Sequence, residues 1–301
     1  MVALSEAEAV ELGCSSAEEK NEVLIFQALD SLTEIALDFI AEEKVEDAGR
    51  IIRSIREIAG IAVENKMELV AINSILAFGK LANEASDRGL KSTTEKIVKA
   101  IGRLGKETGS NALEAGSKVA ITTLMEIRAA SNMQKSREET ITFSVILTEI
   151  GTAAAEHGLK DVLLSAISSV GEIGKSTVGE KLETETLSTL LLLENLGKAA
   201  AKIYYDEALS SAGLSIEEIE KLAFKKQFYG VLPQAQWALE TLRVQAEGQR
   251  LENSEIVAEL ALEYLKNMHV SDTEENIEEN MKKIMDIKAL HAKVISDLQE
   301  N

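Results

Sequence analysis

The apolar residues of this chain follow one repeated pattern, in which three apolar residues spaced three apart are followed directly by a small residue. The third apolar residue of the pattern recurs every 23 residues. Its eight occurrences are Ile35, Ile58, Leu81, Leu104, Ile127, Ile150, Ile173 and Leu196. Because side chains three or four residues apart share one face of an α-helix, each 23-residue unit is predicted to be one amphipathic helix.

The other positions of the pattern are nearly as regular. The first two apolar positions of each unit lie six and three residues before the third, and Ser144 is the one polar residue among them. The small residue is Ala36, Ala59, Ala82, Gly105, Gly151, Gly174 or Gly197, and Arg128 is the one departure. A small residue at this place predicts close approach of a neighbouring helix.

Turn-like stretches separate the predicted helices, among them 87–91 and 156–160, each with a central glycine. Short connections make successive helices antiparallel, so two units form a 46-residue helical hairpin. Ser-x-x-Glu spacing predicts capping boxes at several helix starts. The pairs are Ser16 with Glu19, Ser92 with Glu95, Ser136 with Glu139, Ser215 with Glu218, and Ser271 with Glu274.

The hairpin length and the placement of small residues resemble HEAT repeats over about residues 20–205. The resemblance implies an all-α fold of antiparallel helical hairpins, stacked as a HEAT-like right-handed α-solenoid of about 12–13 helices. The chain lacks the proline and the Asp/Arg ladder of many HEAT units. Tetratricopeptide and ankyrin repeats have other periods, and a closed or globular helical bundle is the alternative fold.

The regularity of the pattern predicts three sections. Residues 1–19 are expected to form an N-terminal capping segment, 20–205 the regular helical repeats, and 206–301 a divergent C-terminal helical section that continues the stack. Pro233 interrupts one junction of the last section, and its final helix is expected over about 273–298.

Charge is placed unevenly along the chain, whose formal net charge is −19. Residues 1–48 hold 2 basic and 13 acidic residues (−11), 49–205 hold 20 and 19 (+1), and 206–301 hold 10 and 19 (−9). Such acidity disfavours nucleic acid and anionic membranes and favours basic protein surfaces as partners, although solubility or a salty cytoplasm would explain it equally well. Self-association, with an acidic end of one copy on a basic strip of another, stays open.

The sequence predicts a cytoplasmic protein without a cofactor. Cys14 is the single cysteine, the N-terminus has no signal-peptide pattern, and the most apolar stretch, Leu187 to Leu193, is too short to span a membrane. His157, His269 and His291 lie far apart, and no phosphate loop, nucleophile elbow or zinc spacing is present. We therefore expect no catalytic residues, no metal site and no enzymatic activity.

Two groups of residues are candidates for partner binding. The first is a basic strip at helical spacing, Lys96, Lys99, Arg103 and Lys106, which could hold an acidic peptide or simply form a solvated convex face. The second is a group of six of the chain's eleven aromatic residues, suited to a partner or ligand pocket or to the filling of an irregular junction. It comprises Tyr204, Tyr205, Phe224, Phe228, Tyr229 and Trp237.

The leading functional hypothesis is a non-enzymatic, protein-binding scaffold or adaptor that presents a curved helical-repeat surface. The alternative is a soluble sensory or regulatory domain of a longer, in one version membrane-associated, protein that binds a small ligand near the aromatic residues. An enzyme built on a helical toroid is the third hypothesis, and it would need paired carboxylates or histidines in one concave pocket.

Overall fold

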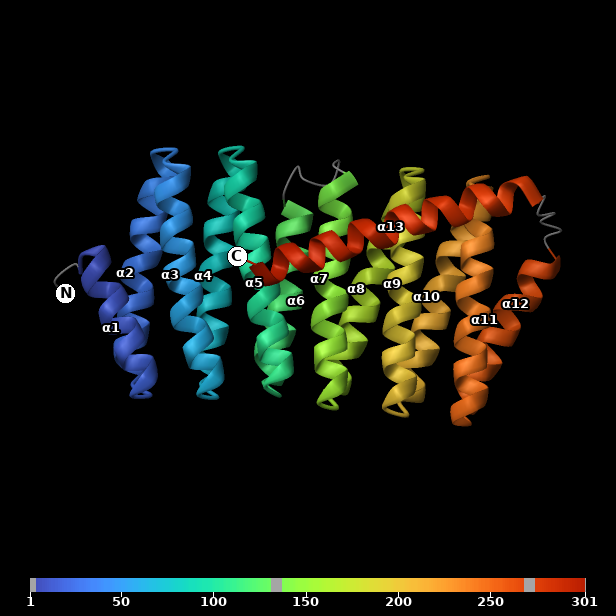
Figure 1. Ribbon diagram of the computed structural model, residues 1–301, viewed down its shortest axis with the longest axis horizontal. Helices are drawn as coiled ribbons and strands as arrows, with labels where there is room; N and C mark the ends of the chain where they lie inside the picture. Colours follow the sequence, from blue (N-terminus) through green and yellow to red (C-terminus); the bar gives the residue numbers. More distant parts are fainter. Residues whose placement is uncertain (1–3, 131–136, 268–273, 301) are drawn as a thin grey trace. The chain divides into compact units, whose positions relative to one another are not determined.

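The computed structural model describes residues 4–130, 137–267 and 274–300, and these residues form thirteen α-helices and one short 3₁₀ turn (Figure 1). The chain divides into two compact units, Met1–Lys135 and Ser136–Asn301. The first unit contains α1 (Glu6–Glu18), α2 (Glu22–Ala41), α3 (Val45–Glu64), α4 (Glu68–Asp87), α5 (Lys91–Ser110) and α6 (Glu114–Ala130). The second contains α7 (Arg137–Glu156), α8 (Lys160–Gly179), α9 (Glu183–Lys202), α10 (Asp206–Lys225), η2 (Tyr229–Val231), α11 (Leu232–Gln249), α12 (Glu252–Asn267) and α13 (Glu274–Glu300).

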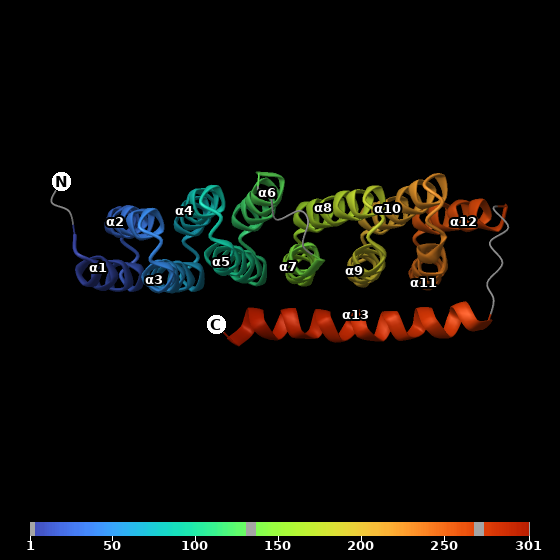
Figure 2. The same cartoon turned by 90° about the horizontal axis from the view of Figure 1, so that it is seen from above.

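Within each unit the helices form two layers. Up to α12, each helix packs against the next along the chain in its unit and against the second next, which lies in its own layer. The odd-numbered layer is therefore α1, α3 and α5 in the first unit and α7, α9 and α11 in the second, as Figure 2 shows. These are the predicted antiparallel hairpins, and the all-α repeat fold is confirmed; the handedness of the superhelix stays a prediction.

The helices end at a backbone feature that repeats every 23 residues. The residue that ends each described hairpin turn has a positive φ, as at Gly89 and Gly158 (both 71°). The next amide donates a hydrogen bond to the carbonyl five residues earlier, as Leu90 does to Ala85 (2.8 Å), which is the Schellman arrangement. The described residues with this φ are Lys20, Glu43, Lys66, Gly89, Ala112, Gly158, Lys181, Tyr204, Gln227 and Arg250.

These turns correct the predicted capping boxes. Ser16, Ser92 and Ser215 lie inside α1, α5 and α10, while Ser136 and Ser271 lie outside the described residues. The helix starts follow the left-handed residue of the preceding turn, so a Ser-x-x-Glu pair within the helix has no free amides to cap. Ser5 forms a complete capping box with Glu8 at the start of α1.

The predicted apolar stripe forms the core, and its small residues mark the closest helix contacts. A Cβ on Gly174 would lie 2.4 Å from Cδ1 of Ile219, and a Cβ on Gly197 would lie 2.6 Å from Cδ2 of Leu242. Each partner lies 45 residues further on, in the next helix of the same layer. Ser144, the polar exception in the stripe, is buried and donates to the carbonyl of Thr140 (3.0 Å).

The last helix does not lie parallel to the others. α12 packs against α10 and α11 like the preceding helices, whereas α13 packs against α7 and α9 and runs across the odd-numbered layer of the second unit (Figures 1 and 2). The 23-residue spacing of the turns continues to Arg250, and the proposed section boundary at residues 205 and 206 stays a prediction.

Candidate helix-binding surface

The helix repeat places one set of side chains on the outer side of each odd-numbered helix. Residues 50, 53 and 56 of α3 recur 46 residues later in α5, and further multiples of 46 reach α7, α9 and α11. We call these the outer positions. They are Arg50, Arg53 and Arg56 in α3; Lys96, Lys99 and Gly102 in α5; Thr142, Val145 and Thr148 in α7; Ser188, Leu191 and Glu194 in α9; and Gln234, Trp237 and Glu240 in α11.

In the second unit, α13 lies against these outer positions. Ser188 of α9 is hydrogen-bonded to Nε2 of His291 (2.7 Å), and both side chains are buried. At the other end of the contact, Nζ of Lys283 pairs with Glu183 at the start of α9 (2.9 Å). The side of α13 that faces the layer carries Ile284, Ile287, His291, Val294 and Leu298, whose alternating spacing of three and four is that of a coiled-coil seam.

His291 is the polar member of this seam, and its surroundings keep it uncharged. Burial lowers the pKa of the imidazole to about 4. The ring is therefore neutral at neutral pH, with one nitrogen available to donate and the other to accept. Its bond to Ser188 satisfies one of these atoms and fixes the register of α13 on α9.

α13 leaves two cavities on this surface, one on each side of His291. The larger, about 620 Å³, lies between α9, α11 and α13. The smaller, about 340 Å³, lies between α7, α9 and α13. Both cavities are bordered by His291, Asn195 and Lys198. The contact of α13 with the odd-numbered layer therefore has unfilled space on two sides.

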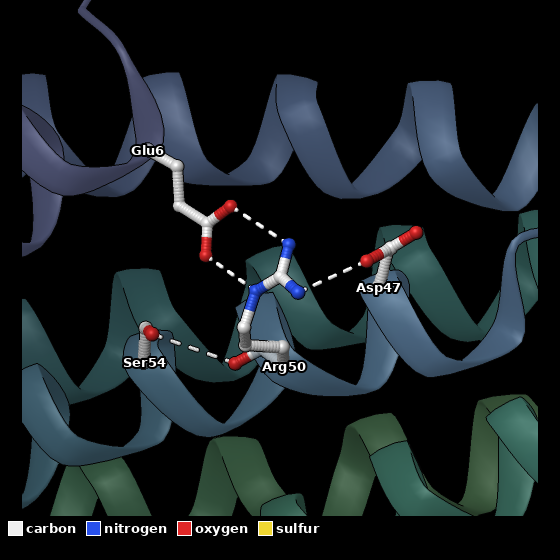
Figure 3. Close-up of polar contacts among 4 residues, drawn as sticks. All are labelled: Glu6, Asp47, Arg50 and Ser54. Carbon is white, nitrogen blue, oxygen red and sulfur yellow. Dashed lines mark hydrogen bonds and ion pairs between the residues drawn. The ribbon is translucent and has the colours of Figure 1, made fainter.

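The outer residues of α3 and α5 are basic except for Gly102, and Arg50, Arg56 and Lys96 form ion pairs with neighbouring helices. The guanidinium of Arg50 donates to both carboxylate oxygens of Glu6 in α1 (2.7 and 3.0 Å) and to Asp47 in its own helix (3.0 Å), as Figure 3 shows. Arg56 pairs with Glu107 of α5. These contacts link α1, α3 and α5 in the odd-numbered layer of the first unit.

The structure places the predicted basic strip on α5, and only in part on the outer positions. Lys96 and Lys99 are outer residues, and Nζ of Lys96 lies 3.6 Å from Glu46 of α3. Arg103 is buried, with 8% of its surface exposed, and burial together with nearby Arg56 lowers its pKa. Lys106 is half-buried, so the strip is more embedded than a solvated face, and its role in partner binding stays a prediction.

The aromatic residues do not form one cluster. Tyr204 and Tyr205 stand at the junction before α10, where Tyr204 is the left-handed turn residue and Lys160 lies 4.8 Å from the Tyr205 ring centre. Phe224, Phe228 and Tyr229 stand at the other end of α10; the Phe224 and Tyr229 rings are 5.8 Å apart, edge to face.

Trp237 is separate from both groups. It occupies an outer position of α11, 68% exposed, and lines the larger cavity. It is thus the one predicted aromatic residue that reaches the surface on which α13 lies. In the 46-residue register of the sequence, Trp237 stands at the same position as Lys99 of the first unit.

Sequence reasoning missed the residues that hold α13, namely Glu183, Ser188, Lys283 and His291. The run Leu187 to Leu193 could have indicated that another element covers α9. It puts apolar residues on more than one face of the helix, and such a helix is buried all round. The outer positions give a second indication that α9 is covered. Charged side chains occupy them in α3 and are replaced in α9 by Ser188 and Leu191.

Among the described residues, no group of three or more His, Cys, Asp and Glu side chains could hold a metal ion. Within the same residues, none of the helices is long and apolar enough to cross a membrane. His157 lies in the turn between α7 and α8, and His269 falls outside the described residues.

No protein-family model and no curated protein matches the chain. Among solved structures, one similar chain is described as a circular tandem repeat protein with novel repeat topology and enhanced subunit contact surfaces. It is 15% identical with a TM-score of 0.49, and the match covers 96% of this chain and 72% of that chain. Another comes from the computational design of self-assembling cyclic protein homo-oligomers, with 18% identity, a TM-score of 0.22 and 98% of each chain covered.

Proposed function

We propose that this protein is a scaffold that binds an amphipathic helix of a partner protein on the outer positions of α7, α9 and α11. The observation that carries the proposal is α13, which occupies this surface through one seam of side chains. A helix laid into an apolar groove is a common mode of peptide recognition, with anchors at helical spacing. In this proposal α13 is the helix bound in the absence of a partner.

The contact is suited to exchange. Cavities of about 620 and 340 Å³ flank the seam, so α13 forgoes packing that a better-fitting helix would gain. The side chains that contact α13 also indicate what a partner helix should carry. Such a helix would carry apolar residues at spacings of three and four and a basic residue to pair with Glu183, as Lys283 does.

A peptide of residues 274–300 tests whether the surface binds a helix from another molecule. In the full-length chain, α13 competes at the high effective concentration of a tethered segment, so the labelled peptide should bind weakly. Val294→Asp places a charge at a buried seam position and should release the tethered helix. We expect the full-length variant to bind the peptide at least about tenfold more tightly than wild type, measured by fluorescence anisotropy.

Two controls make the result specific to the seam. Ala292→Asp puts the same charge on an exposed position of α13 and should leave peptide binding as in wild type. A peptide that itself carries Val294→Asp should not bind the opened protein. If circular dichroism shows that the full-length Val294→Asp variant is folded but it does not bind the unmodified peptide, the helix-binding function is contradicted.

A further inference from the structure

We propose that the cavity between α9, α11 and α13 is a binding site for a neutral small molecule with a largely apolar body and one hydrogen-bond acceptor. The site does not depend on the helix-binding function, because it is assembled while α13 is in place. Its volume of about 620 Å³ lies within the range of small-molecule sites, about 300 to 1,000 Å³.

Gln234 supplies the polar anchor. This outer residue of α11 lines the cavity, and only 5% of its surface is exposed. Its Nε2 is buried without a hydrogen-bond partner among the described residues. A buried donor without a partner costs free energy, and rotation of the side-chain amide toward a ligand oxygen in the cavity would remove that cost.

The remaining walls favour an apolar body. Leu191, Pro233, Trp237, Ile284 and Met285 border the cavity from three different helices. Trp237 and Met285 are 68% and 70% exposed, so large apolar surfaces face the open side of the cavity rather than the core. Covering them with a ligand would remove apolar area from water.

The charged groups at the cavity argue for a ligand without net charge. Lys198 pairs with Glu194, and Glu240 pairs with Arg243 (2.8 Å). Lys288 completes the charged lining, and the lining as a whole holds two acidic and two basic residues. A ligand here contacts α9, α11 and α13 together, so its binding would also stabilise α13 on the layer.

Prodan, a neutral dimethylaminonaphthalene dye with one ketone, is a suitable probe for the full-length protein. Trp237 is the only tryptophan and lies at the cavity, so energy transfer from tryptophan to the dye reports binding at this place. We expect saturable transfer in wild type. Gln234→Leu removes the amide donor and should weaken prodan binding about tenfold, the effect of one lost hydrogen bond.

The matched control is Gln245→Leu, a half-buried glutamine of the same helix that does not border the cavity; it should bind prodan as wild type does. The dye without its ketone-bearing propionyl group should bind wild type more weakly than prodan does and should not distinguish wild type from Gln234→Leu. Absence of saturable transfer in wild type overturns the proposal. Equal prodan affinity in wild type and Gln234→Leu overturns it too, and if that variant does not fold, equal affinity of wild type for the two dyes has the same consequence.

Discussion

The central odd-numbered helices of the two units, α3 and α9, have the same length and the same place in their layers but different outer faces. Of their 20 residues each, 9 are buried in α3 and 15 in α9. The outer positions are Arg50, Arg53 and Arg56 in α3, and Ser188, Leu191 and Glu194 in α9. The inner stripe is apolar in both, so the stripe determines the repeat and the outer positions determine what covers it.

Two carboxylates, Glu107 in the first unit and Glu220 in the second, differ in whether a basic side chain is bonded to them. Burial raises the pKa of Glu107 in α5, but the guanidinium of Arg56 bonded to it acts in the opposite direction. Glu220 in α10 is fully buried, and neither of its carboxylate oxygens has a hydrogen-bond partner in the described residues. Burial and nearby Glu217 raise the pKa of Glu220 to about 8, against which Lys221 has the smaller effect.

Replacing Glu220 should give the largest change in stability. Glu220 stands 23 residues after Gly197, at the small-residue position of the repeat. This position faces a neighbouring helix, which explains why Glu220 is buried. Between about pH 4.5 and 8 the unfolded chain releases this proton while the folded chain keeps it, so stability falls as pH rises through this window. Glu220→Gln stays neutral and should raise the free energy of unfolding at pH 8 by about 2 to 4 kcal/mol.

The measurement is urea unfolding of both proteins at pH 5 and pH 8. The gain should shrink at pH 5, where the carboxyl of Glu220 is protonated in the folded chain. Glu218→Gln, an exposed glutamate of the same helix, is the matched control and should keep the wild-type pH dependence. An equal effect of Glu220→Gln at the two pH values would show that Glu220 is charged in the folded protein.

Exchanging the small residue of α9 for that of α3 should have a smaller effect. α3 has Ala59 at this position and α9 has Gly197, where an added Cβ would lie 2.6 Å from Leu242 and 3.3 Å from Cβ of Ala212. Gly197→Ala should therefore destabilise the protein by about 1 kcal/mol, because overpacking outweighs the better helix propensity of alanine. Thermal unfolding measures the difference.

Gly248→Ala is the control for this exchange. Nothing lies within 4 Å of the added Cβ at Gly248, which is also inside a helix, α11. Alanine there should stabilise the protein by about 0.5 to 1 kcal/mol through helix propensity alone. Stabilisation by both substitutions would mean that the contact of α9 with α11 accommodates an alanine at position 197, as α3 does at Ala59.

The sequence predicted the repeat well, because a core stripe and a small-residue contact leave a period that can be counted. It predicted turns at Gly89 and Gly158, but not that Lys20 or Tyr204 would adopt the same left-handed conformation, since the period rather than residue type places them. Of the residues at the candidate site, only Trp237 is among those that the sequence proposed for partner binding. The contact of His291 with Ser188 joins residues 103 apart, which no local pattern can reveal.

The smallest effect is expected at the outer face of α3, where Arg50 joins Glu6 of α1 to Asp47 (Figure 3). Exposed ion pairs contribute little to stability and are screened by salt. Arg50→Gln should therefore lower the melting temperature slightly at low ionic strength and not at all in molar salt. Arg53→Gln, exposed on the same helix, is the control. A loss that persists in molar salt would indicate that the stem of Arg50 packs on the layer as an apolar residue does, so that the outer face of α3 would resemble that of α9 more than its charge suggests.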